Sequence, residues 1–300
     1  MRVYYSDHYT LPLPKDHRFP VEKYRMLRDL LLHEQILRPE QIIESPLATT
    51  SQLQMAHSLE YIEQMRNGLV PREIIQRIGF PWSFGLYQRS CATVGGAIAA
   101  AHAALTDGIS GNLAGGTHHA HYDRGEGYCV FNDIATAARI LKAKGLAKKI
   151  AIIDLDVHQG NGNSSILSQD TDIFILSLHG EKNYPFKKVP STLDVALADG
   201  TDDEGYLKAL SLALPRVWDF EPDFIFYQMG VDPLKEDLLG KLSLTFEGLM
   251  ERDRAVLLPA RRMQIPISLA LGGGYAKPIE LSVRAYANTY RVVNEVWEQN

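Results

Sequence analysis

Residues 149–162 read KIAIIDLDVHQGNG, an apolar run that ends in Asp154, Asp156 and His158. Side chains two residues apart lie on the same face of an extended strand. The stretch therefore predicts a strand that directs two carboxylates and an imidazole toward one point, where they suit a borderline divalent ion such as Zn²⁺. An Asp at the end of a parallel strand can also merely cap the next helix, so these three residues alone leave both interpretations open.

Three further clusters of glycine and polar residues follow strand-like runs or glycine turns. They are GGTHH at residues 115–119, GVD at residues 230–232 and GGGY at residues 272–275. In open α/β sheets, ligands bind beyond the carboxyl ends of the strands. Four strand endings that carry Asp, His and Tyr are thus expected to converge on one crevice, which favours the metal-site interpretation.

The apolar pattern along the chain predicts an α/β fold. Strand-length apolar segments lie at residues 3–5, 150–155, 173–178, 224–229 and 265–271, and helical patterns lie at 21–37, 90–105, 132–141 and 206–218. Alternation of this kind predicts an open, mostly parallel sheet with helices on both faces. We expect a single domain over residues 1–300, with a long irregular loop at 180–204, of the kind that is often functional or mobile.

Composition narrows the class of protein. The 300 residues are 45% hydrophobic and carry a net charge of −5, without a lysine- or arginine-rich tract, which argues against a nucleic-acid partner. Cys91 and Cys129 form no CxxC pair, so neither a disulfide framework nor a thiolate zinc site is indicated. The longest small-apolar run is too short to span a membrane and no leader is apparent, so we expect a cytoplasmic protein that does not contact membranes.

The candidate ligands Asp156, His158 and Asp232 would leave open positions on a zinc ion for water and a substrate oxygen. Such an ion lowers the pKa of its bound water to roughly 7 and polarises a carbonyl group. Amide hydrolysis also needs a proton shuttle, and the adjacent His118 and His119 meet that need.

Two other residues have candidate roles beside the ion. Asp154 precedes a proposed ligand by two residues, where it can orient an imidazole instead of binding the metal. Tyr275 follows three glycines, a turn that can cradle phosphate, but neither GK[ST] nor GxGxxG spacing is present. We therefore favour a tyrosine hydroxyl that donates a hydrogen bond to a developing oxyanion.

Several motifs in register carry a family resemblance. GGTHHAHYDRGEGYCVFND, DLDVHQGNG, SLHG, GVDPLKEDLLG and LGGGY occur in this order and together resemble the zinc-dependent histone deacetylase family. The phrase IGFPWSFGLYQRS and Asn161 are most similar to its class IV branch and bacterial relatives. The similarity covers nearly the whole chain and implies the arginase/deacetylase α/β fold.

The resemblance implies roles for the catalytic residues. By it, the zinc ligands are Asp156, His158 and Asp232; His119 is the general acid-base, His118 its companion imidazole and Tyr275 the carbonyl-polarising hydroxyl. Asp154 matches the partner of His118, and Asn161 stands beside His119, where many relatives have Asp.

The resemblance also implies a K⁺ site and a substrate tunnel. The K⁺ site would consist of the carbonyls of Asp156, His158 and Leu178, with Asp154 and Ser177. The walls of an acyl-lysine tunnel fall on Gly127, Tyr128 and Tyr184, although one wall in relatives is more often Phe.

Two departures from the family pattern bear on function. Many relatives carry an acidic residue that grips the substrate backbone, whereas residues 79–85, GFPWSFG, contain none. Asn161 in place of Asp removes a charge that would raise the basicity of His119, so we expect a lower working pKa for that imidazole than in relatives with Asp.

Three other functions are compatible with parts of this sequence. An arginase-like binuclear hydrolase usually has a further Asp two residues after the DxH, where this chain has Gly160. A small-molecule deacylase, such as one acting on acylated polyamines, restricts its rim with an insertion that is not evident here. A non-catalytic acyl-lysine or metal-binding module would be expected to have lost the tyrosine, a histidine or a ligand.

The remaining histidines and Cys129 lack a pattern that indicates catalysis. We expect His8, His17, His33, His57, His102 and His179 to be surface or core residues, His121 to lie near the rim of the pocket and Cys129 to be a small buried thiol in it. Asp237 is expected to brace the loop after Asp232.

The sequence as a whole predicts a metal-dependent amidohydrolase that removes an acyl group from the ε-nitrogen of lysine in a protein or peptide. It leaves open the length of the acyl chain, the physiological substrate, the metal loaded in the cell and the oligomeric state.

Overall fold

A computed structural model describes residues 1–14 and 17–298, in which eight strands form one sheet. The strand order is β2-β1-β3-β8-β7-β4-β5-β6, and every neighbouring pair is parallel. The bounds are β1 Arg2–Tyr5, β2 Ile42–Glu44, β3 Ile109–Asn112, β4 Ile150–Asp154, β5 Ile173–Gly180, β6 Leu193–Leu197, β7 Phe224–Gln228 and β8 Ile267–Ala270. The predicted mostly parallel sheet is confirmed and is wholly parallel.

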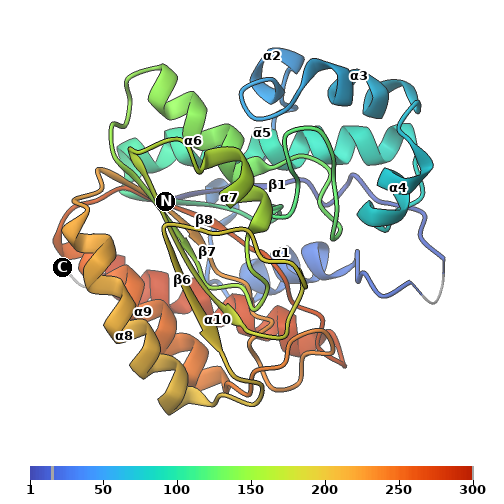
Figure 1. Cartoon of the computed structure of the whole chain (residues 1–300). Coiled ribbons are helices and arrows are strands. Elements are labelled where there is room, and N and C mark those ends of the chain that lie inside the picture. Colours follow the sequence, from blue (N-terminus) through green and yellow to red (C-terminus); the bar gives the residue numbers. More distant parts are fainter. Residues whose placement is uncertain (15–16, 299–300) are drawn as a thin grey trace.

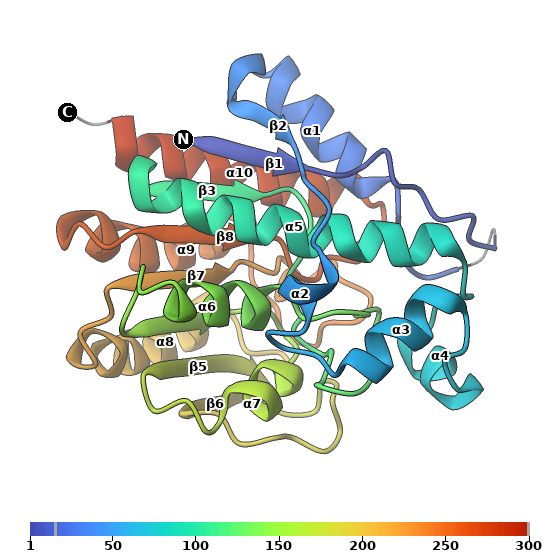
Figure 2. The same cartoon turned by 90° about the horizontal axis from the view of Figure 1, so that it is seen from above.

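Helices cover both faces of this sheet, as predicted (Figure 1). Helices α1, α8, α9 and α10 lie on one side, and α5 and α6, with α2, α3 and α7, lie on the other. Figure 2 shows the strands side by side between these two layers. The bounds are α1 Lys23–His33, α2 Thr50–Leu53, α3 Leu59–Asn67, α4 Arg72–Ile78, α5 Phe84–Asp107, α6 Asp133–Ala143, α7 Asn161–Leu167, α8 Asp203–Asp219, α9 Phe246–Arg262 and α10 Glu280–Glu298, with a 3₁₀ turn η1 at Pro39–Gln41.

The central strands are buried along their whole length because helices cover both of their faces. In this core Ile152 of β4 pairs with Ile175 of β5 on one side and Phe226 of β7 on the other. Continuous apolar runs suit such strands, which is why the hydrophobic segments at 150–155, 173–178 and 224–229 were informative in the sequence.

The predicted elements are largely confirmed, with specific omissions. All five predicted strands and all four predicted helices are present, with shifted ends. The short strands β2 and β3 were not predicted. Each has only three or four residues, some of them polar, and such a segment resembles a loop in the sequence. The prediction of an irregular loop at 180–204 is wrong for residues 193–197, which form edge strand β6 with alternate exposure. Six helices were also not predicted: α2, α3, α4, α7, α9 and α10.

The prediction of one domain over residues 1–300 stays a prediction, and its residues 15, 16, 299 and 300 lie outside the described part of the chain.

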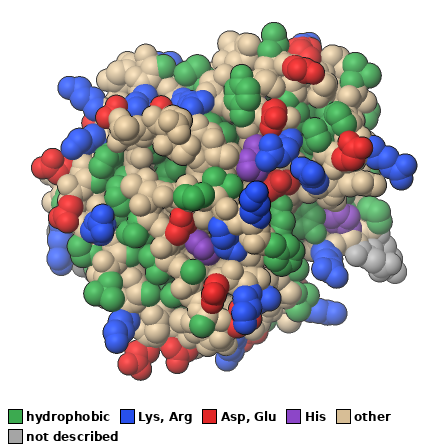
Figure 3. Space-filling view, in the orientation of Figure 1, with side chains coloured by type: hydrophobic (Ala, Val, Ile, Leu, Met, Phe, Trp, Pro, Cys, Tyr) green, Lys and Arg blue, Asp and Glu red, His purple; other side chains and the backbone are tan. Residues whose placement is uncertain are grey.

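Among the described helices, none combines the length and the apolar character that a bilayer crossing requires. On the face shown in Figure 3, lysine and arginine side chains are interspersed with acidic ones and do not gather in a block of one charge.

A buried ion pair on α9 contacts the ends of two central strands, β7 at the carbonyl oxygen of Gly230 and β4 at that of Leu155, the latter at 3.5 Å. Arg252, which is fully buried, pairs with Asp253 at 2.8 Å and donates a hydrogen bond of 2.5 Å to the carbonyl oxygen of Gly230 after β7. Asp253 also accepts hydrogen bonds from the hydroxyls of Tyr227 at 2.5 Å and Thr289 at 2.6 Å. This network ties the layer of α9 and α10 to the strand ends that carry the candidate site.

We expect Asp253→Ala to lower the free energy of unfolding by about 3–5 kcal/mol, because it leaves the charge of Arg252 buried without a partner. Chemical denaturation measures the change. Glu295→Ala is the control, since it removes the carboxylate of the solvent-exposed pair with Arg254 at 2.7 Å and should cost about 1 kcal/mol or less. Equal losses for the two variants would contradict this account of the α9 network.

Candidate active site

The structure brings together the three predicted metal ligands Asp156, His158 and Asp232. One ligand atom from each residue lies within 4.8 Å of the other two. In the described part of the chain, this is the one group of three or more His, Cys, Asp or Glu residues that could hold a metal ion. Nδ1 of His158 is 3.0 Å from Oδ1 of Asp156 and 3.0 Å from Oδ2 of Asp232. All three side chains are buried.

Parallel strands explain why these residues meet. Asp156 and His158 follow β4, and Asp232 follows the neighbouring strand β7, so both loops begin at the same edge of the sheet. The backbone N–H of Gly273 donates to Oδ2 of Asp156 at 2.6 Å, and that of Val157 donates to Oδ1 of Asp232 at 2.9 Å. These bonds fix both carboxylates. The other oxygen of each, Oδ1 of Asp156 and Oδ2 of Asp232, faces His158.

Glycine is required where the surrounding loops touch the carboxylates. A Cβ atom at Gly230 or Gly273 would overlap the carboxylate of Asp156 or Asp232, respectively. The GVD and GGGY motifs therefore combine a polar residue with a backbone that can approach a carboxylate closely.

The electrostatics of the group favour a cation. Burial raises the pKa of Asp232 to about 7, and the nearby charge of Asp156 adds to this effect. Burial opposes protonation of His158, but its hydrogen bonds to the two carboxylates outweigh burial and raise its pKa to about 10. The pocket thus holds positive charge between two carboxylates. Two carboxylates and one imidazole are a donor set that fits Zn²⁺ with an open position.

The adjacent imidazoles of His118 and His119 lie beside this group, with ring centroids 4.1 Å apart. Nδ1 of His118 is 2.7 Å from Oδ2 of Asp154, and Nδ1 of His119 is 2.7 Å from Oδ1 of Asn161. The predicted partners of both histidines are therefore in contact with them.

The two imidazoles have opposite pKa shifts. Burial lowers the pKa of His118, but the charges of Asp154 and Asp156 outweigh burial, so the pKa is raised. Burial lowers the pKa of His119 well below its usual range, and the positive charge of its neighbour adds to this effect. The hydrogen bond to Asn161 opposes this shift, but Asn161 brings no charge to it. That the pKa of His119 is lower than in relatives with Asp at this position stays a prediction.

The loop that carries the two histidines is held by a residue that sequence reasoning missed. The carboxylate of Asp133 accepts hydrogen bonds from the backbone N–H groups of Gly116 at 3.0 Å and Thr117 at 2.8 Å. At the start of α7, the N–H groups of Gly162 and Asn163 donate to the carbonyl oxygen of His118. Acidic residues in the first turn of a helix are common, so the sequence carried no distinctive signal for Asp133.

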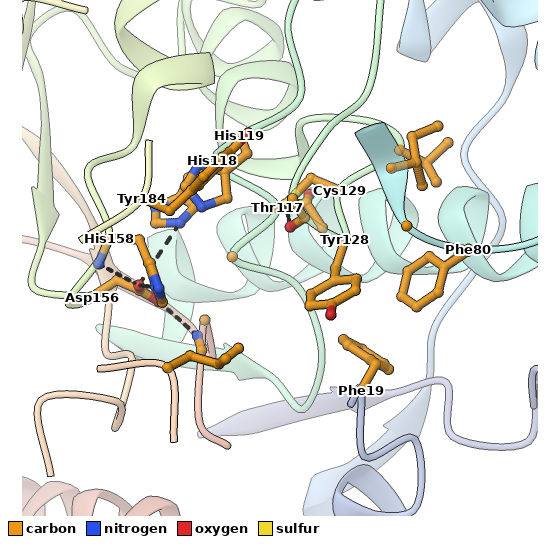
Figure 4. Close-up of a pocket in the computed structure, with 18 of the residues that line it drawn as sticks. Phe19, Phe80, Thr117, His118, His119, Tyr128, Cys129, Asp156, His158 and Tyr184 are labelled. Atoms are coloured by element: carbon orange, nitrogen blue, oxygen red, sulfur yellow. Dashed lines mark hydrogen bonds and ion pairs between the residues drawn. The ribbon is translucent and has the colours of Figure 1, made fainter. Parts of the chain in front are cut away.

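A cavity of about 540 Å³ leads to these residues and is lined by His118, His119, Asp156, His158 and Tyr275 together with the predicted tunnel residues. Figure 4 shows the imidazoles beside Asp156, with Tyr128 on the opposite side of the cavity near Phe19 and Phe80. The ring centroids of Tyr128 are 5.3 Å from each of these two phenylalanines. Sequence reasoning assigned neither phenylalanine to the cavity, although Phe80 lies within the quoted phrase IGFPWSFGLYQRS.

Gly127 and Tyr184 complete the wall next to the histidines. The ring of Tyr184 lies edge-to-face with His119 at 4.9 Å. Gly127 has φ +57°, and a Cβ there would come within 2.7 Å of the His119 ring. Glycine is therefore required at this position, because other residues rarely adopt this positive φ and because a side chain would overlap the His119 ring.

Tyr275 and Asp237 connect the remaining loops. The carboxylate of Asp237 accepts hydrogen bonds from the N–H groups of Leu239 and Gly240 at 2.8 Å, so it braces the loop after Asp232 as expected. It also accepts one of 2.6 Å from the N–H of Tyr275, which fixes the position of that tyrosine. Burial raises the pKa of the Tyr275 hydroxyl well above its usual range, so the group remains a donor.

The less distinctive residues have mixed outcomes. Cys129 is buried in the cavity wall, and burial raises its thiol pKa, as expected for an inert thiol. His121 was expected near the rim, and this is wrong: it is buried and hydrogen-bonded to Ser165 at 2.6 Å. For the K⁺ site, Asp154 and Ser177 are paired across β4 and β5, and the site itself stays a prediction.

Comparison with known proteins identifies the family. The family model described as the histone deacetylase domain matches residues 17–290. The chain belongs to the histone deacetylase family. It is 41% identical over 296 residues to an uncharacterized protein of Picosynechococcus sp., covering 98% of each chain. It is 31% identical to histone deacetylase 2 of Arabidopsis thaliana, covering 92% of this chain and 74% of that protein.

Solved structures of this family share the fold. A histone deacetylase homolog from Aquifex aeolicus matches with a TM-score of 0.83 and 25% identity, covering 100% of this chain and 84% of that one. The sheet described above is thus the arginase/deacetylase fold, and the chain is a hydrolase of the deacetylase family. Its place in the class IV branch and its cytoplasmic location stay predictions.

We expect the purified protein to bind one transition-metal ion per chain, measured by elemental analysis, and Asp232→Ala to bind less than a tenth of that amount because one of three ligands is lost. Asp199→Ala, which removes an exposed carboxylate, is the control. Chelation should lower the melting temperature of the parent protein, since an ion that binds only the folded state stabilises it. Two ions per chain would contradict a mononuclear site.

Proposed function

We propose that this chain is a zinc-dependent deacylase that removes acetyl or longer acyl groups from lysine side chains of proteins or peptides. The observation that supports it best is the convergence of a three-ligand metal group, a histidine pair and a tyrosine on one cavity. Such a constellation supplies a nucleophile, a proton shuttle and an oxyanion donor, the three requirements of amide hydrolysis.

In this proposal Asp156, His158 and Asp232 hold the ion, which when bound lowers the pKa of water to roughly 7 and polarises a carbonyl group. A K⁺ ion held by Asp154, Asp156, His158, Ser177 and Leu178 has a structural role. Gly160 argues against an arginase-like second metal, because a side chain there would overlap the carboxylate of Asp154.

His119 is the proton carrier in the proposed reaction. Its Nδ1 is occupied by Asn161, so its Nε2 is the atom that can accept a proton from the attacking water and return it to the leaving lysine amine. The lowered pKa of His119 keeps the ring neutral and available as a base at physiological pH.

His118 and Tyr275 stabilise charge in the proposed reaction. The carboxylate of Asp154 orients His118 and favours its protonated form, which places a positive charge beside the reacting centre. The Tyr275 hydroxyl, a donor on the cavity wall, hydrogen-bonds to the oxyanion as it develops.

The cavity walls suit a lysine side chain. Tyr128 and Tyr184 flank the path to the histidines and would enclose the alkyl stem of acyl-lysine while excluding water. A free peptide-lysine substrate is preferred to a small polyamine because the 300-residue sequence has no obvious insertion that would narrow the rim. Aromatic and aliphatic residues line much of the remaining cavity, so acyl groups longer than acetyl are part of the proposal.

The deciding experiment compares lysine peptides that carry acetyl to myristoyl groups. We expect the metal-loaded protein to hydrolyse at least one of them, with His119→Ala lowering kcat by roughly 10²- to 10⁴-fold and Tyr275→Phe by roughly 10²- to 10³-fold. Leu212→Ala is the control, since this exposed side chain lies on α8 and does not line the cavity. Turnover at the parental rate by both active-site variants would refute the mechanism.

The pH profile tests the role of Asn161. Asn161→Asp places a carboxylate against Nδ1 of His119, which stabilises the imidazolium and raises the pKa of the ring. Since the ring must be neutral to accept a proton, the acid limb of the kcat/KM profile should move to higher pH. An acid limb that stays in place would argue against His119 as the group that titrates.

A further inference from the structure

Glu126 lies behind the histidine pair and has no role in the mechanism above. It precedes the tunnel wall, and its side chain is 12% exposed. Its Oε1 accepts a hydrogen bond of 2.7 Å from Nδ2 of Asn161, the residue that contacts His119. Asn161 thus bridges a carboxylate and the candidate general base.

Hydrogen-bond directions in this cluster can be followed from one end. The hydroxyl of Ser165 donates to the carbonyl oxygen of Gly162 at 3.1 Å, so it accepts from Nδ1 of His121 at 2.6 Å. Nε2 of His121 lies 3.2 Å from Nδ2 of Asn161 and 3.4 Å from Oε1 of Glu126. The carboxylate of Glu126 is therefore the acceptor that holds Nδ2 of Asn161 on the side away from His119.

This arrangement fixes which nitrogen of His119 carries the hydrogen. Because Nδ2 of Asn161 faces Glu126, its Oδ1 faces His119 and accepts from Nδ1 at 2.7 Å. Nε2 then keeps its lone pair. If the amide turned around, Nδ2 would donate to Nδ1 of His119 and place the ring hydrogen on Nε2, a form that cannot accept a proton there.

We propose that Glu126 is a positioning residue that, through Asn161, sets the tautomer of His119 in which Nε2 is the free base. The proposal rests on the proposed function in assigning proton transfer to that atom. A carboxylate is suited to this role because it only accepts hydrogen bonds. An aspartate at position 161 would not need Glu126 to orient it, since either oxygen of a carboxylate can accept the hydrogen bond from His119.

The ionisation of Glu126 is consistent with this role. Burial opposes its ionisation, but hydrogen bonds from His121, Asn161 and Tyr184 outweigh burial and lower its pKa to about 2. The carboxylate is therefore an acceptor throughout the pH range in which a deacylase would work.

The kinetic test uses the metal-loaded full-length protein with its best acyl-lysine peptide. We expect Glu126→Ala to lower kcat by roughly tenfold or more, the effect of losing one hydrogen bond to a charged group, with little change in KM. Adding Asn161→Asp to Glu126→Ala should restore kcat to within a few-fold of the parent, because Asp presents an acceptor to His119 in either orientation. Glu181→Ala, at an exposed acid outside the cluster, is the control and should leave kcat unchanged.

A spectroscopic test reads the tautomer directly. Nitrogen NMR of ¹⁵N-histidine protein, assigned with a His119→Ala sample, should show His119 protonated on Nδ1 in the parent and in the double variant, and a mixture of tautomers in Glu126→Ala. If Glu126→Ala proves unstable, Glu126→Gln serves, because its amide can offer either end to Asn161 and should cause a smaller shift in the same direction.

The outcomes separate this inference from the proposed function. An unchanged tautomer in Glu126→Ala overturns the inference, as does a loss of kcat that Asn161→Asp does not restore. A tautomer that responds to Glu126→Ala in a protein without deacylase activity supports the positioning role and refutes the proposed function.

Discussion

The attraction between one imidazole and two buried carboxylates determines much of this structure. Asp156 and Asp232 are 1% and 0% exposed, and carboxylates removed from water in this way need a nearby cation. His158 meets that need at 3.0 Å from each of them. Glycine loops and backbone N–H groups then close around the carboxylates, so the site is shaped by main chain as much as by side chains.

The two histidines beside this group show how one fold gives opposite pKa shifts to two residues of one type. His118 has a carboxylate partner and His119 a carboxamide partner, each at 2.7 Å. The pKa of the first ring is raised and that of the second is lowered. Pairs of titratable groups whose surroundings separate their pKa values are typical of acid and base assignments. A single atom of difference between Asp154 and Asn161 accounts for much of this separation.

The alternation of Asp156 and His158 after an apolar run made them predictable, although β4 ends at Asp154 and both residues lie in the loop that follows. The buried apolar runs of β4, β5 and β7 were equally clear. The family resemblance led to Asn161 and to Tyr184, which no local pattern would have selected. Asp133 and Glu126 could not be found in this way, since each acts on a residue that the fold brings near from 16 or 35 positions away. Strand β3 was missed because its sequence, ISGN, is mostly not apolar. The strand is buried because other elements cover it.

Strand β8 lies between β3 and β7, although it comes from residues 267–270, near the end of the chain. Strand β4 pairs with β7 on one side and β5 on the other, so these three strands can associate before β8 has been synthesised. In the described sheet, β1 and β3 join them only through β8. A nascent chain that stops short of this segment would have two unjoined halves of sheet, each with an open edge of the kind that promotes aggregation. Synthesis of roughly the last tenth of the protein therefore completes the sheet and adds Tyr275 to the cavity wall at the same time.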